Sequence, residues 1–161
     1  MTGTTIGAAR PADYDQIRRL TCEVYLQGGF GSPEYQAQLA DVEGRATRAQ
    51  LLVARTGGRV MGSVALVLDG TFGEITHDPS EAAFRMLVVD PAMRGVGIGE
   101  LLVRTCLDRA RAAGSRTMVL STEPTMHAAH RLYERLGFRR LPERDWTPLP
   151  GTDLLVYSLE L

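Results

Sequence analysis

A short apolar run, followed at once by a glycine-rich turn and a long amphipathic segment, constrains the fold of this chain most. Residues 84–89 are apolar except for Arg85, and Gly95, Gly97 and Gly99 follow within ten residues. Glycines let a backbone approach an anion closely, and the N–H groups and dipole of a helix N-terminus favour negative charge. The pattern therefore predicts a strand, a turn and a helix that bind a phosphate group.

Two well-known phosphate motifs fit these residues poorly. A P-loop ends in Gly-Lys-Ser/Thr, whereas this chain has Gly97-Ile98-Gly99-Glu100 and so lacks the lysine and the hydroxyl. In the dinucleotide fingerprint, the third glycine after Gly95 and Gly97 would fall on Glu100, whose carboxylate would face the pyrophosphate. The residues alone thus indicate an α/β domain with a phosphate site.

A third motif fits better. Arg94, Gly97 and Gly99 form the pattern Arg-x-x-Gly-x-Gly, and together with the preceding strand it resembles the acyl-coenzyme A motif of the GNAT superfamily of N-acetyltransferases. Further along, residues 131–138 read Arg-Leu-Tyr-Glu-Arg-Leu-Gly-Phe and resemble the second signature of that family, a tyrosine-bearing helix that ends at Gly-Phe. Two motifs in the same order and at the same separation are more specific than either alone.

The resemblance implies a fold and a reaction. The expected fold is a single domain over residues 1–161 of the α/β (α+β) class, with a mixed sheet of about six to seven strands, about four flanking helices and a splay between two parallel strands. The expected reaction moves an acetyl group from acetyl-CoA directly to a primary amine. The acceptor would be a small molecule, a peptide, or the terminus or a lysine of a protein. Neither a metal nor a covalent enzyme intermediate is expected.

The resemblance also assigns residues to acetyl-CoA. The edge of the central strand would pair with the pantetheine arm, an N–H group near its end would stabilise the oxyanion, and the glycine turn would hold the pyrophosphate. The residues concerned are Leu87, Val88, Val89, Arg94, Gly95, Val96, Gly97, Ile98 and Gly99. Tyr133 stands at the position of the family's general acid, and a phenol of pKa about 10 can protonate a leaving thiolate.

The general base is harder to assign, because the family's usual Glu and Asn are replaced here by Phe84 or Arg85, Ser121 and Met126. Glu123 is the first candidate, since it lies just past a strand end and close to the tyrosine helix. Glu81 and Glu74 come next. His127 and His130 have suitable ordinary pKa values, but exposed or packed histidines are the more common case. A chain of water molecules is a further alternative.

The apolar period alternates between about two and 3.6 residues along the chain, as in α/β and α+β domains. It predicts strands at 5–10, 51–54, 60–68, 84–89, 116–121 and 154–161, and helices at 11–25, 34–47, 97–113 and 127–136. The loop at 28–33 is either a substrate lid or an ordinary turn, and 71–83 and 142–151 are connections.

Charge and composition limit the partners. With 18 basic and 19 acidic residues among 161, the chain has a formal charge of −1, which argues against nucleic acid as the main partner. No apolar run is long enough to span a membrane, and the first five residues lack signal-peptide features, so a cytoplasmic location is expected. Cys22 and Cys106 are expected in the core. The sequence is compatible with either a monomer or a homodimer.

Two other functions remain as alternatives. The absence of the family's Glu and Asn would fit a non-catalytic acyl-CoA sensor or partner module on the same fold, although the retained Tyr133 argues against it. A nicotinamide-dependent oxidoreductase is the second alternative, but Glu100 stands where the dinucleotide fingerprint has its third glycine.

Overall fold

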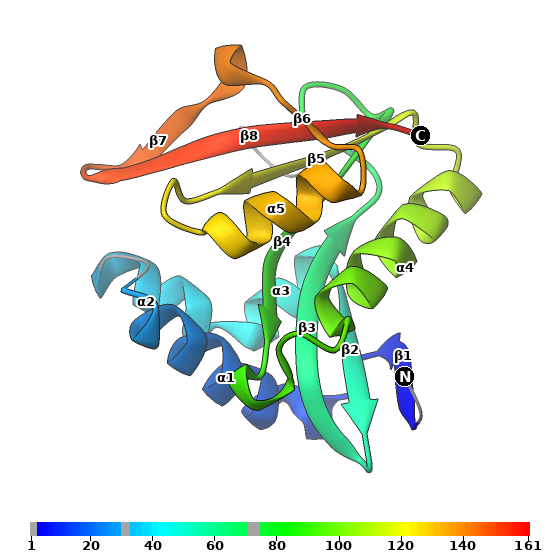
Figure 1. Ribbon diagram of the computed structural model, residues 1–161, viewed down its shortest axis with the longest axis vertical. Coiled ribbons are helices and arrows are strands. Elements are labelled where there is room, and N and C mark those ends of the chain that lie inside the picture. Colours follow the sequence, from blue (N-terminus) through cyan, green and yellow to red (C-terminus); the bar gives the residue numbers. More distant parts are fainter. Residues whose placement is uncertain (1–2, 30–32, 71–74) are drawn as a thin grey trace. The chain divides into compact units, whose positions relative to one another are not determined.

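The computed structural model describes residues 3–29, 33–70 and 75–161 (Figure 1). In these residues the chain forms an eight-stranded mixed sheet and five α-helices, which confirms the predicted α/β class with somewhat more elements than the sequence indicates. The strands are β1 (Thr4–Ala8), β2 (Gln50–Thr56), β3 (Arg59–Val67), β4 (Glu81–Val89), β5 (Thr117–Thr122), β6 (Arg139–Arg140), β7 (Trp146–Leu149) and β8 (Thr152–Glu160). The α-helices are α1 (Tyr14–Gln27), α2 (Pro33–Ala40), α3 (Val42–Arg48), α4 (Ile98–Ala112) and α5 (His127–Arg135).

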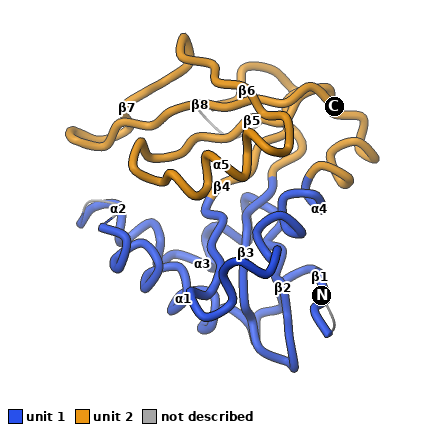
Figure 2. The backbone as a smooth tube through the Cα atoms, in the orientation of Figure 1, with its two compact units in different colours: residues 1–66, 86–106 blue, residues 67–85, 107–161 orange. Residues whose placement is uncertain are grey.

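Neighbouring strands are hydrogen-bonded in the order β1-β2-β3-β4-β5-β8-β6, and β7 pairs with β8 outside this path. The chain divides into two compact units (Figure 2). Unit 1 contains residues 1–66 and 86–106, and unit 2 contains residues 67–85 and 107–161. Strand β4 and helix α4 therefore each contribute residues to both units.

In unit 1, strands β1, β2 and β3 form an antiparallel sheet. The turn between β2 and β3 consists of Gly57 and Gly58, which have φ angles of 58° and 80°. Two successive positive φ angles match the right-handed twist of a two-residue hairpin, so the predicted hairpin is confirmed. The sequence predicts an apolar face of Ile17, Leu20, Val24 and Tyr25 on helix α1. The structure buries Ile17, Leu20 and Tyr25, whereas Val24 is half-buried.

The predicted helix at 34–47 is wrong in one respect, because the structure has two helices there. Asp41 separates them: its side chain accepts a hydrogen bond from the Gly44 N–H at 3.0 Å and caps α3. The buried Arg45 donates to the carbonyl oxygens of Gln38 and Leu39 at 2.7 and 3.1 Å, where α2 ends. Capping of both helix ends by side chains favours the break over one continuous helix.

In unit 2, β4 and β5 run parallel, as expected for strands joined by a helix. Two sequence-based boundaries are wrong. Strand β4 begins at Glu81 rather than at residue 84. Ala82 and Ala83 are fully buried and belong to the strand, but small residues give a weak strand signal in the sequence. Strand β7 lies within the predicted loop at 142–151; it contains Pro148, which an edge strand tolerates.

Strand β4 has one unusual backbone angle. Met86 has a φ of 55°, the only positive value for a non-glycine residue within 3–29, 33–70 and 75–161. A side chain in this region of backbone space interrupts the regular extended strand. The regular ladder of β4 with β5 comprises the residue pairs Glu81 to Ala83 with Thr117 to Val119, which precede this point.

Candidate functional site

The glycine turn lies in unit 1 between β4 and α4. Just after β4, the Asp90 N–H donates to the Met61 carbonyl oxygen at 2.8 Å, which ties the strand end to β3. The Asp90 carboxylate accepts from the Ala92 N–H at 2.9 Å and caps the short 3-10 turn η3 (Pro91–Met93). These bonds fix the point from which the chain enters the turn, and the Leu101 N–H donates to the Gly97 carbonyl oxygen as α4 begins.

The turn itself requires glycine. Gly95 and Gly97 are exposed and have φ angles of 81° and 92°, a region that side-chain-bearing residues rarely adopt. An added Cβ at either position would meet no atom within 4 Å, so the space in front of the turn is open. The N–H groups of the first turn of α4 have no partner within the helix. With the exposed Arg94, they make a cradle that suits a phosphate group.

The preceding residues of β4 present two different faces. Val88 is 2 % exposed and belongs to the core, whereas its neighbours Leu87 and Val89 are half-buried. The alternation follows from the two-residue period of a strand. All nine residues predicted to bind acetyl-CoA thus lie in one continuous segment of unit 1, which includes the last three residues of β4 and the first two of α4.

Tyr133 lies in unit 2, on α5, and is 5 % exposed. Its ring is surrounded by three other rings, those of Phe84, Phe138 and Tyr157, with centroid distances of 5.9, 5.8 and 6.0 Å. We call these four residues the aromatic cluster. Tilted contacts at such distances stabilise aromatic pairs. The sequence motif identified Tyr133 and the following Gly-Phe, but it did not reveal Tyr157, which comes from β8.

The aromatic cluster is fixed by polar contacts around Tyr157. The Tyr157 hydroxyl donates to a Glu134 carboxylate oxygen at 3.1 Å, and the Arg140 guanidinium lies 5.6 Å from the ring centroid. Burial raises the pKa of Tyr157, and the hydrogen bond and charge of Glu134 raise it further. Tyr157 therefore holds its proton and serves as a neutral donor.

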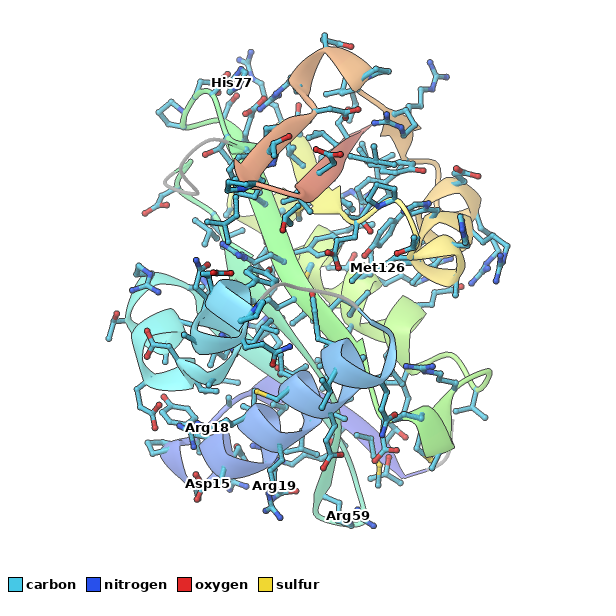
Figure 3. The ribbon with its side chains drawn as sticks, turned by 90° about the vertical axis from the view of Figure 1, so that its left-hand side faces the viewer. Asp15, Arg18, Arg19, Arg59, His77 and Met126 are labelled. Carbon is cyan, nitrogen blue, oxygen red and sulfur yellow. The ribbon has the colours of Figure 1, made fainter. Side chains whose placement is uncertain are left out.

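Glu123 lies in the turn between β5 and α5, and its side chain is half-buried. Its carbonyl oxygen accepts from the Met126 N–H at 3.1 Å and lies 3.0 Å from His130 Nε2. Met126 directly precedes α5 (Figure 3). Since a carbonyl oxygen can only accept, Nε2 carries the proton in this contact, and the neutral His130 ring has its lone pair on Nδ1.

The environment of His130 favours that neutral ring. Burial lowers the pKa of His130, and the nearby His127 and Arg140 act in the same direction. The Glu123 carbonyl and the Glu134 carboxylate oppose this shift without reversing it. The His130 ring also lies 5.6 Å from the Tyr157 ring, so His130 and Tyr133 share this neighbour.

Glu81, a weaker candidate for the base, is committed to another contact. Its two carboxylate oxygens accept from Arg144 at 2.9 and 3.0 Å, and one also accepts from the His77 N–H at 2.6 Å. Burial raises the pKa of Glu81, but Arg144 and the His77 N–H outweigh it and the pKa lies below its usual value. A carboxylate held in this way is a poor proton acceptor. Glu74 lies outside the described residues.

Other predicted features have mixed outcomes. Cys106 is buried, as predicted, whereas Cys22 is only half-buried. In the loop predicted as either a lid or an ordinary turn, Gly28 and Gly29 are exposed, and residues 30–32 lie outside the described part. Within the described ranges, no three His, Cys, Asp or Glu side chains are grouped as metal ligands would be. None of the helices described here is long and apolar enough to cross a bilayer.

Comparison with known proteins identifies the family of this chain. Residues 14–138 match the model of the acetyltransferase (GNAT) family. An IAA acetyltransferase of Azospirillum brasilense is 34 % identical over 141 residues, which make up 86 % of each chain. N-acetylaspartate synthetase of Danio rerio is 34 % identical over 116 residues, but the matched part is 70 % of this chain and only 39 % of that protein.

A solved structure shows the same fold. A Salmonella typhimurium protein described as an acetyltransferase, with its cofactor acetyl-CoA, superimposes with a TM-score of 0.73 at 25 % identity, over 99 % of this chain and 95 % of that one. The matches cover both motifs and most of the chain, and the chain belongs to the acetyltransferase (GNAT) family.

Proposed function

We propose that residues 1–161 act as one N-acetyltransferase domain, which transfers the acetyl group of acetyl-CoA to a primary amine. The observation that carries this proposal is the exposed turn with positive φ angles at Gly95 and Gly97, directly before the N-terminus of α4. It offers backbone N–H groups and open space to a pyrophosphate. Family membership supports acetyl-CoA as the donor.

In the proposed reaction the neutral amine attacks the thioester carbonyl carbon, the C–S bond breaks, and the thiolate leaves. An N–H group near Val89 stabilises the oxyanion that develops on the carbonyl oxygen, and the edge of β4 at residues 87–89 aligns the pantetheine arm. Tyr133 donates its phenolic proton to the leaving thiolate. Glu123 accepts the proton that the ammonium must lose before attack. After attack the nitrogen loses a second proton, which restores the phenol of Tyr133 once its own proton has gone to the thiolate.

The acceptor is proposed to be a small molecule or a peptide with a free amine. The similarity to N-acetylaspartate synthetase makes aspartate the first compound to test, although the match covers less than half of that protein. A peptide with a free amino terminus and a polyamine extend the test to other classes of amine. Release of free CoA thiol reports turnover for all of them.

Binding is tested by thermal unfolding with acetyl-CoA and, separately, with NADH. A ligand at about 100 times its Kd stabilises the folded state by about 2.7 kcal/mol, which is enough to raise the Tm by several degrees. We expect acetyl-CoA to raise the Tm and NADH to leave it unchanged. A shift with NADH alone would instead support the oxidoreductase alternative.

Turnover separates the enzyme from the sensor alternative, since a sensor would bind acetyl-CoA without acetylating any amine. The chain contains no lysine, so radiolabel from acetyl-CoA cannot accumulate on lysine side chains of the protein itself. We therefore expect label in the acceptor and none on side chains of the denatured protein. Label on a side chain would contradict direct transfer.

A further inference from the structure

Gly62 lies in the middle of β3, where three elements of unit 1 meet. In the β2–β3 ladder Gly62 pairs with Ala54 and Val60 pairs with Arg55, so Met61 between them is an extra residue, a β-bulge. The Met61 carbonyl oxygen accepts from the Asp90 N–H, just after β4. The bulge and this hydrogen bond hold the end of β4 beside β3.

The position of Gly62 leaves little room for a side chain. A Cβ there would lie 3.0 Å from Ile98 Cγ2, 3.0 Å from Leu102 Cδ1 and 3.0 Å from the Val88 carbonyl oxygen. The φ of Gly62 is not positive, so backbone conformation does not require glycine here. The reason for glycine at this position is space, because the first two turns of α4 and the end of β4 both approach β3 closely.

The three atoms that crowd Gly62 belong to the proposed acetyl-CoA site or border on it. Val88 is part of the strand edge, Ile98 is the first residue of α4, and Leu102 lies one turn further along. Ile98 and Leu102 are 1 % and 0 % exposed, so neither can swing into solvent. Even one methyl group at position 62 would have to move its neighbours by a few tenths of an ångström.

We propose that Gly62 is a positioning residue of the acetyl-CoA site, which sets the distance between the edge of β4 and the N-terminus of α4. This inference rests on the proposed function. One ligand must reach both the strand edge and the helix N-terminus, and binding sites tolerate displacements of only about 0.5 Å. A displacement of α4 away from β4 therefore lowers the affinity for acetyl-CoA before it disrupts the fold.

The test is Gly62→Ala, with Gly7→Ala as the matched control. Gly7 lies in β1 of the same sheet, and a Cβ there would meet only Arg55 Nη1, at 3.9 Å. We expect Gly62→Ala to raise the Kd and KM for acetyl-CoA about tenfold, with a smaller change in kcat, and Gly7→Ala to match the wild type. Selective loss of affinity distinguishes positioning from a general loss of folded protein.

A compensating substitution strengthens the test. Leu102→Ala removes Cδ1, one of the three crowding atoms, so the effect of Gly62→Ala on the acetyl-CoA Kd should be smaller in the Leu102→Ala background than in the wild type. Wild-type affinity in folded Gly62→Ala would overturn the inference. If Gly62→Ala folds neither alone nor in the Leu102→Ala background, Gly62 supports the sheet in general and the inference is also overturned. Failure of the wild type itself to bind acetyl-CoA would refute the proposed function instead.

Discussion

Tyr133 can lose its hydroxyl without losing its ring, so its proposed chemistry can be separated from its packing. Phenylalanine at this position keeps the contacts with Phe84, Phe138 and Tyr157. Because removal of one general acid costs about 10² to 10⁴ in rate, we expect Tyr133→Phe to lower kcat by that factor. The Kd for acetyl-CoA should stay close to the wild-type value, as measured by titration calorimetry.

Tyr157→Phe is the matched control, since it removes a hydroxyl from the same aromatic cluster. This hydroxyl donates to Glu134 at the surface and has no proposed part in the reaction. We expect nearly unchanged kcat and a slightly lower Tm, because one hydrogen bond contributes about 0.5–1.5 kcal/mol. If Tyr133→Phe and Tyr157→Phe behaved alike, Tyr133 would be a packing residue only.

The proton acceptor is tested with Glu123→Gln. An ammonium must become neutral before it attacks, and a lysine-like amine has a pKa of about 10.4. If Glu123 accepts this proton, Glu123→Gln lowers kcat/KM at neutral pH and regains part of it at high pH, where free amine is abundant. Profiles of kcat/KM against pH for both proteins measure the effect.

His130→Gln is the companion variant, because the glutamine amide can still donate to the Glu123 carbonyl while the titratable ring is lost. We expect a profile like that of the wild type. A loss of rate in His130→Gln, with none in Glu123→Gln, would assign the base to the Nδ1 lone pair of the neutral His130 ring. If both variants retained the wild-type profile, a chain of water molecules would be the remaining explanation.

At the scale of elements, the sequence predicts most of the helices and strands, because strong apolar periods mark them. The sequence-based prediction fails where side-chain contacts determine the boundary of a helix or strand. The break between α2 and α3 depends on Asp41 and Arg45, whose capping bonds compete with helix continuation and leave the apolar pattern unchanged. The start of β4 at Glu81 is missed because Ala82 and Ala83 give a weak strand signal, and because the contact of Glu81 with Arg144, 63 residues further along the chain, is not visible in the local sequence.

The candidate site shows the same division. The motifs predict the glycine turn and Tyr133 as site residues, since phosphate binding and proton donation need particular residue types at fixed spacing. Gly62 is not identified, because a glycine that is needed for space gives no signal in a single sequence. Tyr157 and its contacts with the tyrosine helix likewise become visible only after the chain has folded.

The glycine turn is the element whose role can be tested most directly. Gly97→Val places a branched side chain in the open space in front of the α4 N-terminus, at a φ of 92°. Since the side chain would occupy the proposed phosphate path, we expect acetyl-CoA to lose its effect on the Tm. Backbone strain should also lower the Tm of the free protein, by an amount that corresponds to about 1–3 kcal/mol.

Gly114→Val controls for this strain. Gly114 follows the other end of α4, has a φ of 83°, and would likewise place its Cβ in open space. We expect a similar loss of stability in the free protein, with the full acetyl-CoA shift retained. Equal acetyl-CoA shifts in the two variants would contradict the placement of the pyrophosphate at the glycine turn.

At the scale of the whole molecule, each unit contains a carboxylate that is paired with an arginine distant in sequence. In unit 1 the buried Asp13 carboxylate accepts from Arg55 and from the Arg10 N–H. In unit 2 Glu81 accepts from Arg144. Burial raises the pKa of Asp13, but these hydrogen bonds and the two arginine charges outweigh it, so the pKa is lowered. Both units thus depend on ionised carboxylates, and acid should destabilise both.

The dependence on pH can be assigned to Glu81 with a single substitution. The pKa of Glu81 is lower in the folded state than its unfolded value of about 4.3, so its stabilising effect is present above that value and is lost as the pH falls through the folded pKa. We expect Glu81→Gln to lower the Tm at neutral pH, and the difference from the wild type to shrink as the pH falls below about 4. Glu143→Gln, at an exposed neighbour of Arg144, should show no such dependence in the same melting series. A constant Tm difference between Glu81→Gln and the wild type across this range would mean that the carboxylate packs against Arg144 without stabilising the fold through its charge.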